Sequence, residues 1–343
     1  MKIILDCMSG DMGARPAVEG AAAAVKGHGI EVMLVGKTDV LESAIRESGV
    51  SREGLSIRDA QDVITMTDDP VHAIREKKAA SMVVALNAAA AGEGDAVVSA
   101  GNTGALLTGA TLIVRRLHGA RRGALGSVMP TGQGHALLMD CGANVECTPE
   151  MLVQFAYMGS AFMAGTMGIA SPRVGLVNNG SEPEKGPPMY VETHRLLRAA
   201  DERGLIRFIG NVEGRDLLVG AADVYVADGF TGNLILKTLE GAGLYFAGEI
   251  KRMLLRNAAT KLTALTLRGG VRDLKKRMDY KEVGGAPILG IRRPVIKAHG
   301  ASNARAFESA ILQAVRFCES GAIANMERAL SSMKTNDEGG ASK

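Results

Sequence analysis

Aromatic residues are scarce in this sequence of 343 residues, and tryptophan is absent. Phe and Tyr together make up only 3% of the chain, so Ala, Val, Leu, Ile and Met must fill its interior. Proteins that stack nucleic-acid bases use aromatic platforms, which this composition does not supply, so no nucleic-acid partner is expected. The formal net charge of +3 is also too small to indicate a polyanionic partner by itself.

Cysteine and metal-binding motifs are missing as well. The four cysteines, at positions 7, 141, 147 and 318, form no Cys-x-x-Cys pair and fit no zinc or disulfide framework. No His-Glu-x-x-His or other compact metal motif occurs, so we predict neither a metal nor a cofactor. No signal peptide follows Met1, which favours a reduced, cytoplasmic protein.

An uncharged run from Met151 to Ala170 is long enough to cross a bilayer. Its hydrophobicity is diluted by Gln154, Ser160 and Thr166 and by several alanines and glycines. The run therefore predicts a helix buried in the core or at a subunit interface, in preference to a membrane span.

Glycine, in contrast, is abundant. The chain has 43 glycines without the Gly-X-Y period of collagen, and its 46% hydrophobic and 22% charged residues are typical of a globular protein. A chain of this length supplies ample material for a buried core, in one large domain or two ordinary ones.

Short apolar runs alternate with Ala-rich segments of helical spacing along the chain. This alternation predicts a mostly parallel sheet with helices on both faces. We predict a single large α/β domain over residues 1–330, with or without a division into two lobes, and a disordered polar tail over 331–343. The expected strands are Lys2–Leu5, Glu31–Val35, Leu55–Arg58, Ala96–Ser99, Ala136–Met139, Arg173–Val177, Ile206–Ile209, Asp223–Ala227 and Val295–Lys297. Expected helices include Pro16–Lys26, Asp39–Ser48, Gly104–Leu117 and Pro188–Arg203.

Polar turns rich in Gly, Asn, Asp and Thr follow five of these strands. Open α/β sheets bind ligands beyond the carboxyl ends of their strands, where glycine lets the backbone approach and helix N-termini attract anions. Gly and Asn also serve turn geometry and helix capping, which is the alternative at any one turn. Five such turns together favour a shared anion site. They begin at Asp6, Ala100, Asp140, Asn178 and Asp228.

Motifs for nucleotide binding and covalent catalysis are incomplete. No Gly-x-Gly-x-x-Gly follows a strand, and Gly36–Thr38 resembles only the end of a phosphate loop, because Glu31 occupies the first glycine position. No Gly-x-Ser-x-Gly elbow accompanies a serine. Cys7 and Cys141 follow strand ends, where a reactive thiol and an ordinary buried cysteine would both fit. For His299, which ends a strand before a glycine, a site role and a structural role are equally open.

Residues 251–281 form a strongly basic segment. They include ten basic and two acidic side chains, a net charge of +8, so that the rest of the chain carries −5. We predict a basic amphipathic helical insertion at about 248–281, suited to an anionic lipid surface or an acidic partner. A solvated helix with its apolar stripe in the core is the alternative. The stripe consists of Ile250, Leu254, Ala258, Leu262 and Leu265.

Seven motifs occur together in this chain in the order found in one known family. They are Asp6-Cys7-Met8-Ser9-Gly10-Asp11, Ser99-Ala100-Gly101-Asn102-Thr103-Gly104-Ala105, Asp140-Cys141-Gly142-Ala143-Asn144, Asn211-Val212-Glu213-Gly214-Arg215-Asp216, Asp228-Gly229-Phe230-Thr231-Gly232-Asn233, Gly284-Gly285-Ala286-Pro287 and Lys297-Ala298-His299-Gly300. With them the sequence resembles the bacterial phosphate acyltransferase (PlsX) family from about residue 2 to 328. Any one motif is weak, but seven in order are highly specific.

The resemblance implies an acyl-(acyl-carrier-protein):phosphate acyltransferase, which moves a fatty acyl group from acyl carrier protein to inorganic phosphate. The acyl phosphate would serve phospholipid (phosphatidic acid) synthesis through a membrane glycerol-3-phosphate acyltransferase (PlsY). The resemblance also implies a homodimer with a three-layer α/β/α Rossmann-like fold, related to isocitrate and isopropylmalate dehydrogenases and phosphate acetyltransferase. The basic segment adds the expectation of a cytoplasmic protein that associates peripherally with an anionic membrane surface.

This chemistry needs no catalytic triad and no covalent intermediate. Phosphate is largely a dianion near neutral pH, and a thiolate leaves readily because its acid has a pKa of about 8.5. An anion cradle, correct orientation and donors for the developing oxyanion are sufficient for direct attack. Cys7 and Ser9 stand where the family usually has Ala and Gly, so we predict that the cysteines are dispensable.

Three groups of candidate residues follow from the turns, the basic segment and the resemblance. The candidate catalytic residues are Asn102, Thr103, Asp228, Asn233, Lys237 and His299. The candidate phosphate- or substrate-binding residues are Asp6, Ser9, Gly10, Asp11, Gly13, Gly101, Gly104, Asn144, Asn179, Lys185, Gly229, Thr231, Gly232, Gly285 and Lys297. The candidate carrier-protein or membrane surface comprises Arg256, Lys261, Leu262, Leu265, Arg272, Lys275, Lys276 and Arg277.

Three other functions remain open at this point. A phosphate acetyl- or butyryltransferase would use the same chemistry on acyl-coenzyme A, although the basic segment favours an acidic carrier protein. A dehydrogenase of the isocitrate type would need a metal-binding Asp cluster and a nicotinamide pocket. A non-catalytic membrane scaffold would leave the five polar turns unexplained.

Overall fold

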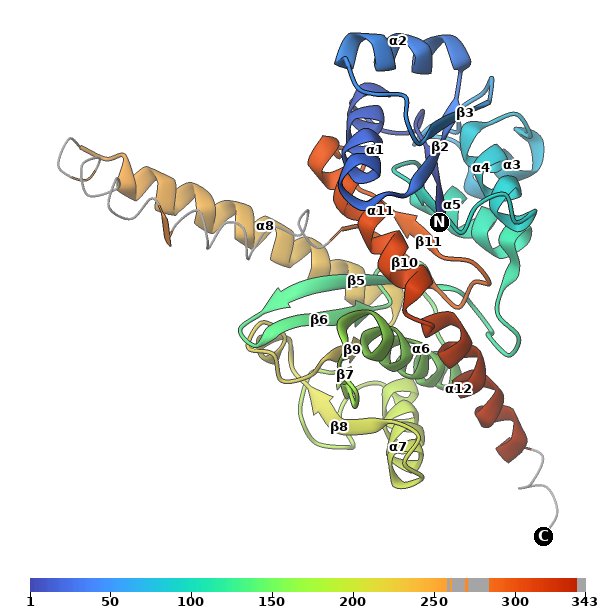
Figure 1. Cartoon of the computed structure of the whole chain (residues 1–343). Helices are drawn as coiled ribbons and strands as arrows, with labels where there is room; N and C mark the ends of the chain where they lie inside the picture. The colour runs from blue at the N-terminus through green and yellow to red at the C-terminus, as the bar shows by residue number, and fades with distance from the viewer. Residues whose placement is uncertain (258–259, 261–268, 271–283, 338–343) are drawn as a thin grey trace.

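The structure, a computed structural model, describes residues 1–257, 260, 269–270 and 284–337 (Figure 1). Strands and helices alternate along the chain, as the apolar runs predict. The strands are β1 (Lys2–Asp6), β2 (Glu31–Gly36), β3 (Leu55–Asp59), β4 (Ala96–Ser99), β5 (Ala124–Thr131), β6 (Gly134–Met139), β7 (Arg173–Val177), β8 (Arg207–Val212), β9 (Val224–Val226), β10 (Ala286–Leu289) and β11 (Val295–Lys297). The helices are α1 (Arg15–His28), α2 (Thr38–Ser48), α3 (Pro70–Glu76), α4 (Ser81–Ala90), α5 (Thr103–Gly109), the π-helix η1 (Ala110–Arg115), α6 (Pro149–Met167), α7 (Pro188–Glu202), the 3₁₀ helix η2 (Gly214–Asp216), α8 (Gly229–Leu254), α11 (Ala304–Glu319) and α12 (Ala322–Asp337).

Within the described residues, eleven strands form one sheet in the order β3-β2-β1-β4-β11-β10-β5-β6-β9-β7-β8. The strands from β3 to β11 form one parallel block, and those from β6 to β8 form another. Antiparallel pairings through β10 and β5 join the blocks, which therefore run in opposite directions. The predicted mostly parallel α/β sheet is confirmed.

The twist of the sheet turns the carboxyl ends of the two blocks toward the same side. Neighbouring strands rotate by roughly 20–25°, so the six steps from β1 to β9 accumulate roughly 120–150°. Because β9 runs opposite to β1, this rotation offsets most of the reversal. The turns after β1, β4 and β11 can thus face the turn after β9.

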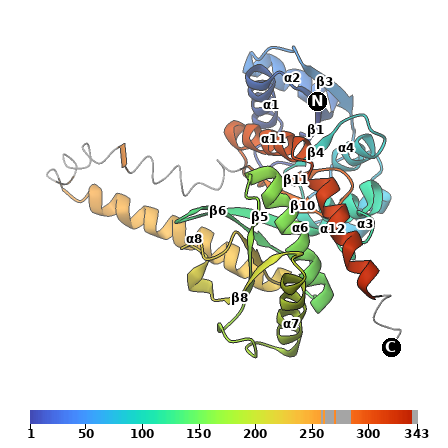
Figure 2. The same ribbon diagram turned by 60° about the horizontal axis from the view of Figure 1, so that its bottom comes forward.

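Helices cover both faces of the sheet, which gives the predicted α/β/α layering (Figures 1 and 2). Ile3 and Leu5 of β1 pack in the apolar cluster that includes α1, α6 and α11, whereas Ile4 packs in the cluster that includes α3 and α4. Successive strand side chains point to opposite faces, so β1 contributes to both cores.

Two strands, β5 and β10, lie where the sequence predicts none. Both belong to the antiparallel part of the sheet. Gly126, Ser127 and Pro130 interrupt the apolar pattern of β5, and the four-residue β10 contains Pro287. The nine predicted strands are all present, with ends shifted by at most three residues.

Helix α6 confirms the buried helix predicted from the uncharged run. It packs between α7 and α12, and Phe155 and Phe162 are among its fully buried side chains. No helix in the described part of the chain is long and apolar enough to cross a membrane.

Helix α8 contains the beginning of the predicted basic insertion. It is continuous over 26 residues and projects from the body of the protein (Figures 1 and 2). The insertion predicted from residue 248 therefore starts as the last part of α8, not as a separate element. Arg256, which follows the helix, is exposed. The other predicted surface residues lie outside the described residues: Lys261, Leu262, Leu265, Arg272, Lys275, Lys276 and Arg277.

Helix α12 corrects the predicted start of the disordered tail. It extends to Asp337, past Ser331, where the polar composition predicts disorder. Met326 and Leu330 are fully buried on the face that packs against α6, and this packing stabilises the helix. Residues 338–343 lie outside the described part of the chain.

Candidate active site

The carboxyl ends of β1, β4 and β11 place an acidic, a hydroxyl and a basic side chain in one row. Asp6 pairs in register with Ser99, and Ser99 pairs in register with Lys297. Residues paired across neighbouring strands project from the same face, so the three side chains are neighbours. The Ser99 hydroxyl donates a hydrogen bond to Asp6 Oδ2 at 2.7 Å.

The fully buried Asp6 carboxylate fixes the turn that follows β1. It accepts hydrogen bonds from the Ser9 hydroxyl at 2.7 Å and from the Met8 N–H at 3.3 Å. The Ser9 hydroxyl is therefore used within the turn. The predicted role of Asp6 and Ser9 at the site becomes one of holding the turn in shape.

The β1 turn also contacts the turn after β11. The Asp11 N–H donates to the Gly300 carbonyl oxygen at 2.9 Å, and the Gly13 N–H donates to the Gly10 carbonyl oxygen at 3.2 Å. The exposed Asp11 carboxylate lies beside Gly300, since a Cβ at that glycine would come within 2.6 Å of Asp11 Oδ2. The structure thus brings these predicted turn residues together at one edge.

The side chain of Asn102, in the turn after β4, is engaged at both ends. Its Oδ1 accepts from the Ala105 N–H at 3.0 Å and caps α5. Its Nδ2 lies 3.3–3.5 Å from the carbonyl oxygens of Thr65, Met66 and Asp68. Asn102 therefore fastens the loop after β3 to the start of α5.

The neighbours of Asn102 continue this turn. The Gly101 N–H donates to the Ser99 hydroxyl at 3.1 Å, which joins the turn to the Asp6 carboxylate through Ser99. Thr103 and Gly104 form the first residues of α5 and are half-buried.

Lys297 holds the turns after β4 and β11 together. Its ammonium donates to the carbonyl oxygen of Ala100 at 3.1 Å and to that of Ala298. Gly285 lies against its backbone, because a Cβ at that glycine would approach the Lys297 carbonyl oxygen to 2.6 Å. His299 is exposed, and its Nδ1 accepts from the Ala301 N–H at 3.2 Å.

The charge of Lys297 is opposed by its surroundings. Burial lowers the pKa of Lys297 to about 8, and the ammonium of Lys237 on α8 adds to this effect. The carboxylates of Asp11 and Asp6 act in the opposite sense but do not offset the burial.

Asp228 caps the N-terminus of α8 at the end of β9. Its Oδ1 accepts from the Thr231 N–H at 2.9 Å, and its Oδ2 accepts from the Thr231 hydroxyl at 2.8 Å and from the Tyr190 phenol. A buried carboxylate with these three donors is suited to orienting the turn. Thr231 uses its hydroxyl in the same contact.

The turn after β6 is built around Asp140. Its carboxylate accepts from the N–H groups of Leu125, Ala143 and Asn144 and from Asn144 Nδ2. Burial raises the pKa of the Asp140 carboxyl, against these four hydrogen bonds. Asn144 Nδ2 also donates to the Gly123 carbonyl oxygen at 2.9 Å, so this predicted binding residue serves the turn itself.

The first turn of α8 is in backbone contact with the turn after β6. The Gly229 N–H donates to the Asn144 carbonyl oxygen at 2.7 Å. A Cβ at Gly232 would lie 1.9 Å from the Asp140 carbonyl oxygen, so no larger residue fits there without movement of the backbone. These two predicted glycines are therefore required by close approach of two chain segments.

The remaining predicted residues lie at or near exposed surface. Asn233 and Lys237 occupy the first turns of α8, where Lys237 pairs with Glu240 at 2.8 Å. Asn179 and Lys185 are exposed in the loop between β7 and α7. These polar side chains lack the saturating contacts of Asp6, Asp140 and Asp228.

The cysteines near the site are poor nucleophiles. Cys7 and Cys141 are buried, and burial raises the pKa of both thiols far above the ordinary value, with neighbouring carboxylates adding to the shift. Burial likewise raises the pKa of Cys147 to about 12. A thiolate is the reactive form of cysteine, so these environments favour the inert thiol.

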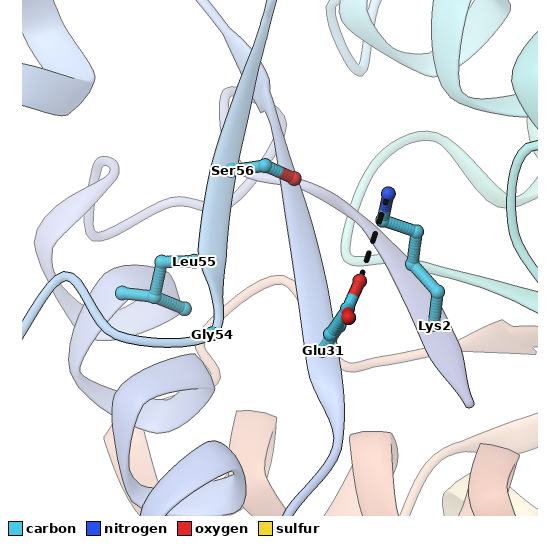
Figure 3. Close-up of a pocket in the computed structure, with 5 residues that line it drawn as sticks. All are labelled: Lys2, Glu31, Gly54, Leu55 and Ser56. Carbon is cyan, nitrogen blue, oxygen red and sulfur yellow. Dashed lines mark ion pairs between the residues drawn. The ribbon is translucent and has the colours of Figure 1, made fainter.

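Two further observations limit where a ligand could bind. The described residues contain no group of three or more His, Cys, Asp or Glu side chains placed to hold a metal ion. A small surface pocket lined by Lys2, Glu31, Gly54, Leu55 and Ser56 lies at the amino ends of β1, β2 and β3 (Figure 3). It is at the opposite end of these strands from the polar turns, and Lys2 and Glu31 pair within it at 3.8 Å.

Three residues of this network were not predicted as site residues: Ser99, Asp140 and Tyr190. Ser99 and Asp140 belong to motifs that the sequence analysis identified, but only the strand register of Ser99 and the hydrogen bonds of Asp140 reveal their roles. Tyr190 lies 38 residues from Asp228 and carries no motif. Its contact depends on tertiary structure that brings the start of α7 to the start of α8, which the sequence does not encode locally.

The fold is shared with solved structures of two kinds of enzyme. Over 93% of this chain and 94% of the other, it is similar to a phosphotransacetylase from Streptococcus pyogenes, with a TM-score of 0.64 and 16% sequence identity. It is also similar to a 4-hydroxythreonine-4-phosphate dehydrogenase from Klebsiella pneumoniae, with a TM-score of 0.51 and 13% identity over 92% of this chain and 99% of the other. These likenesses confirm the predicted relation to the phosphate acetyltransferase and dehydrogenase fold.

The sequence comparisons then identify the family. A family profile described as fatty acid synthesis protein matches residues 1–325. A phosphate acyltransferase from Thermoanaerobacterium thermosaccharolyticum is 41% identical over 328 residues, 96% of each chain. One from Anoxybacillus flavithermus is 43% identical over 336 residues, 97% of this chain and all of the other. The chain belongs to this family of phosphate acyltransferases, and the predictions of PlsX membership and of an acyltransferase are confirmed.

Proposed function

We propose that this chain transfers a fatty acyl group from an acyl carrier protein thioester to inorganic phosphate, between the turns after β1, β4 and β11 and the first turns of α8. The observation that carries the proposal is the row of Asp6, Ser99 and Lys297 at the carboxyl ends of β1, β4 and β11. The row combines turns fixed by hydrogen bonds with a lysine ammonium, and a positive charge suits an anionic substrate. Family membership supplies the reaction class.

The reaction is a direct displacement. A phosphate oxygen forms a bond to the thioester carbonyl carbon, the carbon–sulfur bond breaks, and its electron pair leaves on sulfur. The proton of the hydrogen phosphate dianion is transferred, through solvent or a site group, to the departing thiolate. The products are acyl phosphate and the free thiol, and no covalent enzyme intermediate is needed.

The reactants are bound by side chains whose hydrogen-bonding groups are not all used within the protein. Lys237 and Asn233 at the start of α8 donate to phosphate or to the thioester oxygen, with Lys185 and Asn179 from the loop after β7. Thr103 and His299 border the same edge. Asn102, Asp228 and the Asp6 turn act through position, because their polar atoms hold neighbouring segments.

Partners extend the same proposal. The end of α8 exposes Leu244, Tyr245 and Phe246, which supports a covered surface in a homodimer or at an anionic membrane. The basic segment after α8 is proposed to bind the acidic carrier protein and the membrane surface. We also propose a cytoplasmic protein, peripherally associated with the membrane, whose acyl phosphate passes to the membrane glycerol-3-phosphate acyltransferase PlsY.

Mass detection of acyl phosphate tests the proposal. The protein is incubated with phosphate and either a long-chain acyl carrier protein or the matching acyl-coenzyme A. Product from the carrier protein supports the proposal. Product from coenzyme A alone would instead establish the second candidate, a phosphate acetyl- or butyryltransferase type of enzyme, which the phosphotransacetylase-like fold favours. No acyl phosphate from either donor would contradict both.

A further inference from the structure

Lys297 is a half-buried lysine whose ammonium is held by backbone carbonyls. Two of its three N–H bonds are used by the oxygens of Ala100 and Ala298. No carboxylate lies within 4.0 Å of its Nζ among the described residues, in contrast to Lys2, Lys77 and Lys237, which each pair with an acidic side chain. One donor of Lys297 therefore remains for an acceptor that enters from outside the chain.

The charged groups around Lys297 come from three other segments. Asp6 on β1 lies two strands away, with Ser99 between the two side chains, and Asp11 lies in the turn after β1. Lys237 on α8 contributes a positive charge, and His299 follows Lys297 by two residues in the turn after β11. The two carboxylates stabilise the ammonium, whereas burial and Lys237 destabilise it and hold its pKa at about 8.

We propose that phosphate binding at this edge of the sheet is coupled to uptake of a proton by Lys297, whose third N–H then donates to a phosphate oxygen. The inference rests on the proposed function and deepens it, because it names the counterion of the substrate dianion. In the balanced step, neutral Lys297 takes one proton from solvent as the hydrogen phosphate dianion enters. The negative charge of the bound phosphate compensates for the loss of hydration that disfavours the Lys297 ammonium in the free protein.

The linkage has a defined dependence on pH. With a pKa of about 8 in the free protein and a higher value in the complex, about half a proton is taken up per phosphate bound at pH 8. The uptake approaches one proton above this pH and becomes small below it. Phosphate affinity falls about tenfold for each pH unit above 8, since the competent form of Lys297 becomes rarer.

Isothermal titration of the protein alone with inorganic phosphate tests this inference. Titrations at pH 8 and one unit above, in two buffers of different ionisation enthalpy, give the number of protons taken up. Lys297→Arg, which stays charged, should bind phosphate without proton uptake and without the loss of affinity at high pH. Lys297→Met should bind at least tenfold more weakly, with no proton uptake. Lys2→Met, at the other end of β1, should match the parent protein.

The outcomes separate this inference from the proposed function. Proton uptake that persists in both Lys297 variants, or is absent from the parent protein at both pH values, would overturn the inference even if acyl phosphate is formed. Proton uptake that depends on Lys297 would support it even if neither acyl donor reacts. Because the parent protein alone supplies the first measurement, the inference stays testable if a variant does not fold.

Discussion

The phenol of Tyr190 on α7 donates a hydrogen bond to the Asp228 carboxylate, the cap of α8. The Asp228 N–H donates back to the phenol oxygen at 3.3 Å. Burial, followed by the hydrogen bond to Asp228, raises the pKa of Tyr190 above its ordinary value, so the phenol remains a donor throughout the neutral range. This contact ties the start of α7 to the start of α8.

Replacement of Tyr190 by Phe should therefore loosen the start of α8. Asp228 keeps two donors from Thr231, so we expect a loss of unfolding free energy of about 1–2 kcal/mol, with the fold retained. Urea denaturation measures this loss. Tyr157→Phe, on α6, is a control for removal of a phenol elsewhere. Equal stability of Tyr190→Phe and the parent protein would contradict a structural role for this hydrogen bond.

Substitutions at Asn102 should separate its two contacts. Asn102→Ala removes both the cap of α5 and the tether to the loop after β3, and should lower turnover about 10²-fold, the loss that a small displacement of the reacting groups can cause. Asn102→Asp keeps an acceptor for the Ala105 N–H but loses the amide donors. Steady-state rates of acyl phosphate formation provide the measurement. Near-normal turnover of folded Asn102→Ala would remove Asn102 from the site.

Loss of the Lys237 ammonium should weaken phosphate binding. Lys237→Met removes a positive charge that acts at the Lys297 turn, so we expect the phosphate KM to rise about tenfold or more with a smaller change in kcat. Lys251→Met, near the far end of the same helix, should leave the phosphate KM unchanged. An unchanged KM in Lys237→Met would mean that this lysine serves only its ion pair with Glu240.

The cysteines should be dispensable for turnover. Cys7→Ala and Cys141→Ala are expected to retain activity, because burial raises both thiol pKa values and only protonated thiols are present at neutral pH. The rate should likewise show no rise that follows thiol ionisation between pH 7 and 9. Intact-protein mass spectrometry after reaction with acyl donor should detect no acylated thiol. An acyl adduct on either cysteine would contradict direct attack by phosphate.

The basic segment after α8 yields a prediction from the sequence alone. Reversal of Arg272, Lys275, Lys276 and Arg277 to Glu should raise the KM for acyl carrier protein and leave the phosphate KM unchanged. The interaction should weaken with salt, since exposed charges are screened beyond roughly 8–10 Å at physiological ionic strength.

A second pair of substitutions, Leu262→Glu with Leu265→Glu, should instead reduce co-sedimentation with anionic liposomes. If the charge reversals change neither carrier-protein KM nor lipid binding, the segment is only a solvated surface.

The sequence predicted the parts of the fold that depend on local pattern. Buried parallel strands such as β1 and β4 are continuous apolar runs, and each ends at a polar turn that the sequence displays. It missed β5 and β10, because Gly126, Ser127 and Pro130 interrupt the apolar pattern of β5, and β10 is only four residues long and contains Pro287.

Only part of the candidate site could be predicted from the sequence. The sequence identified the polar turns, but it did not show which of their side chains hold the turns in shape and which remain available to a ligand. Asn102 and Asp228 have the chemistry of ligand-binding residues, yet their polar atoms are used by neighbouring backbone. Lys297 was one of many candidate binding residues, and only its register with Ser99 and its buried ammonium distinguish it. Tertiary packing decides which polar groups are left unsaturated.

Helix α8 connects the candidate site with the projecting part of the molecule. Its first turn includes Gly232, which fits closely against Asp140. The helix is continuous for 26 residues, about 39 Å, from Gly229 to Leu254. Its first turn packs directly on the turn after β6, because a Cβ at Gly232 would lie 1.9 Å from the Asp140 carbonyl oxygen. A displacement imposed on the projecting end is therefore transmitted to Asn233 and Lys237, so whatever surface receives that end also sets the alignment of the groups proposed to bind phosphate.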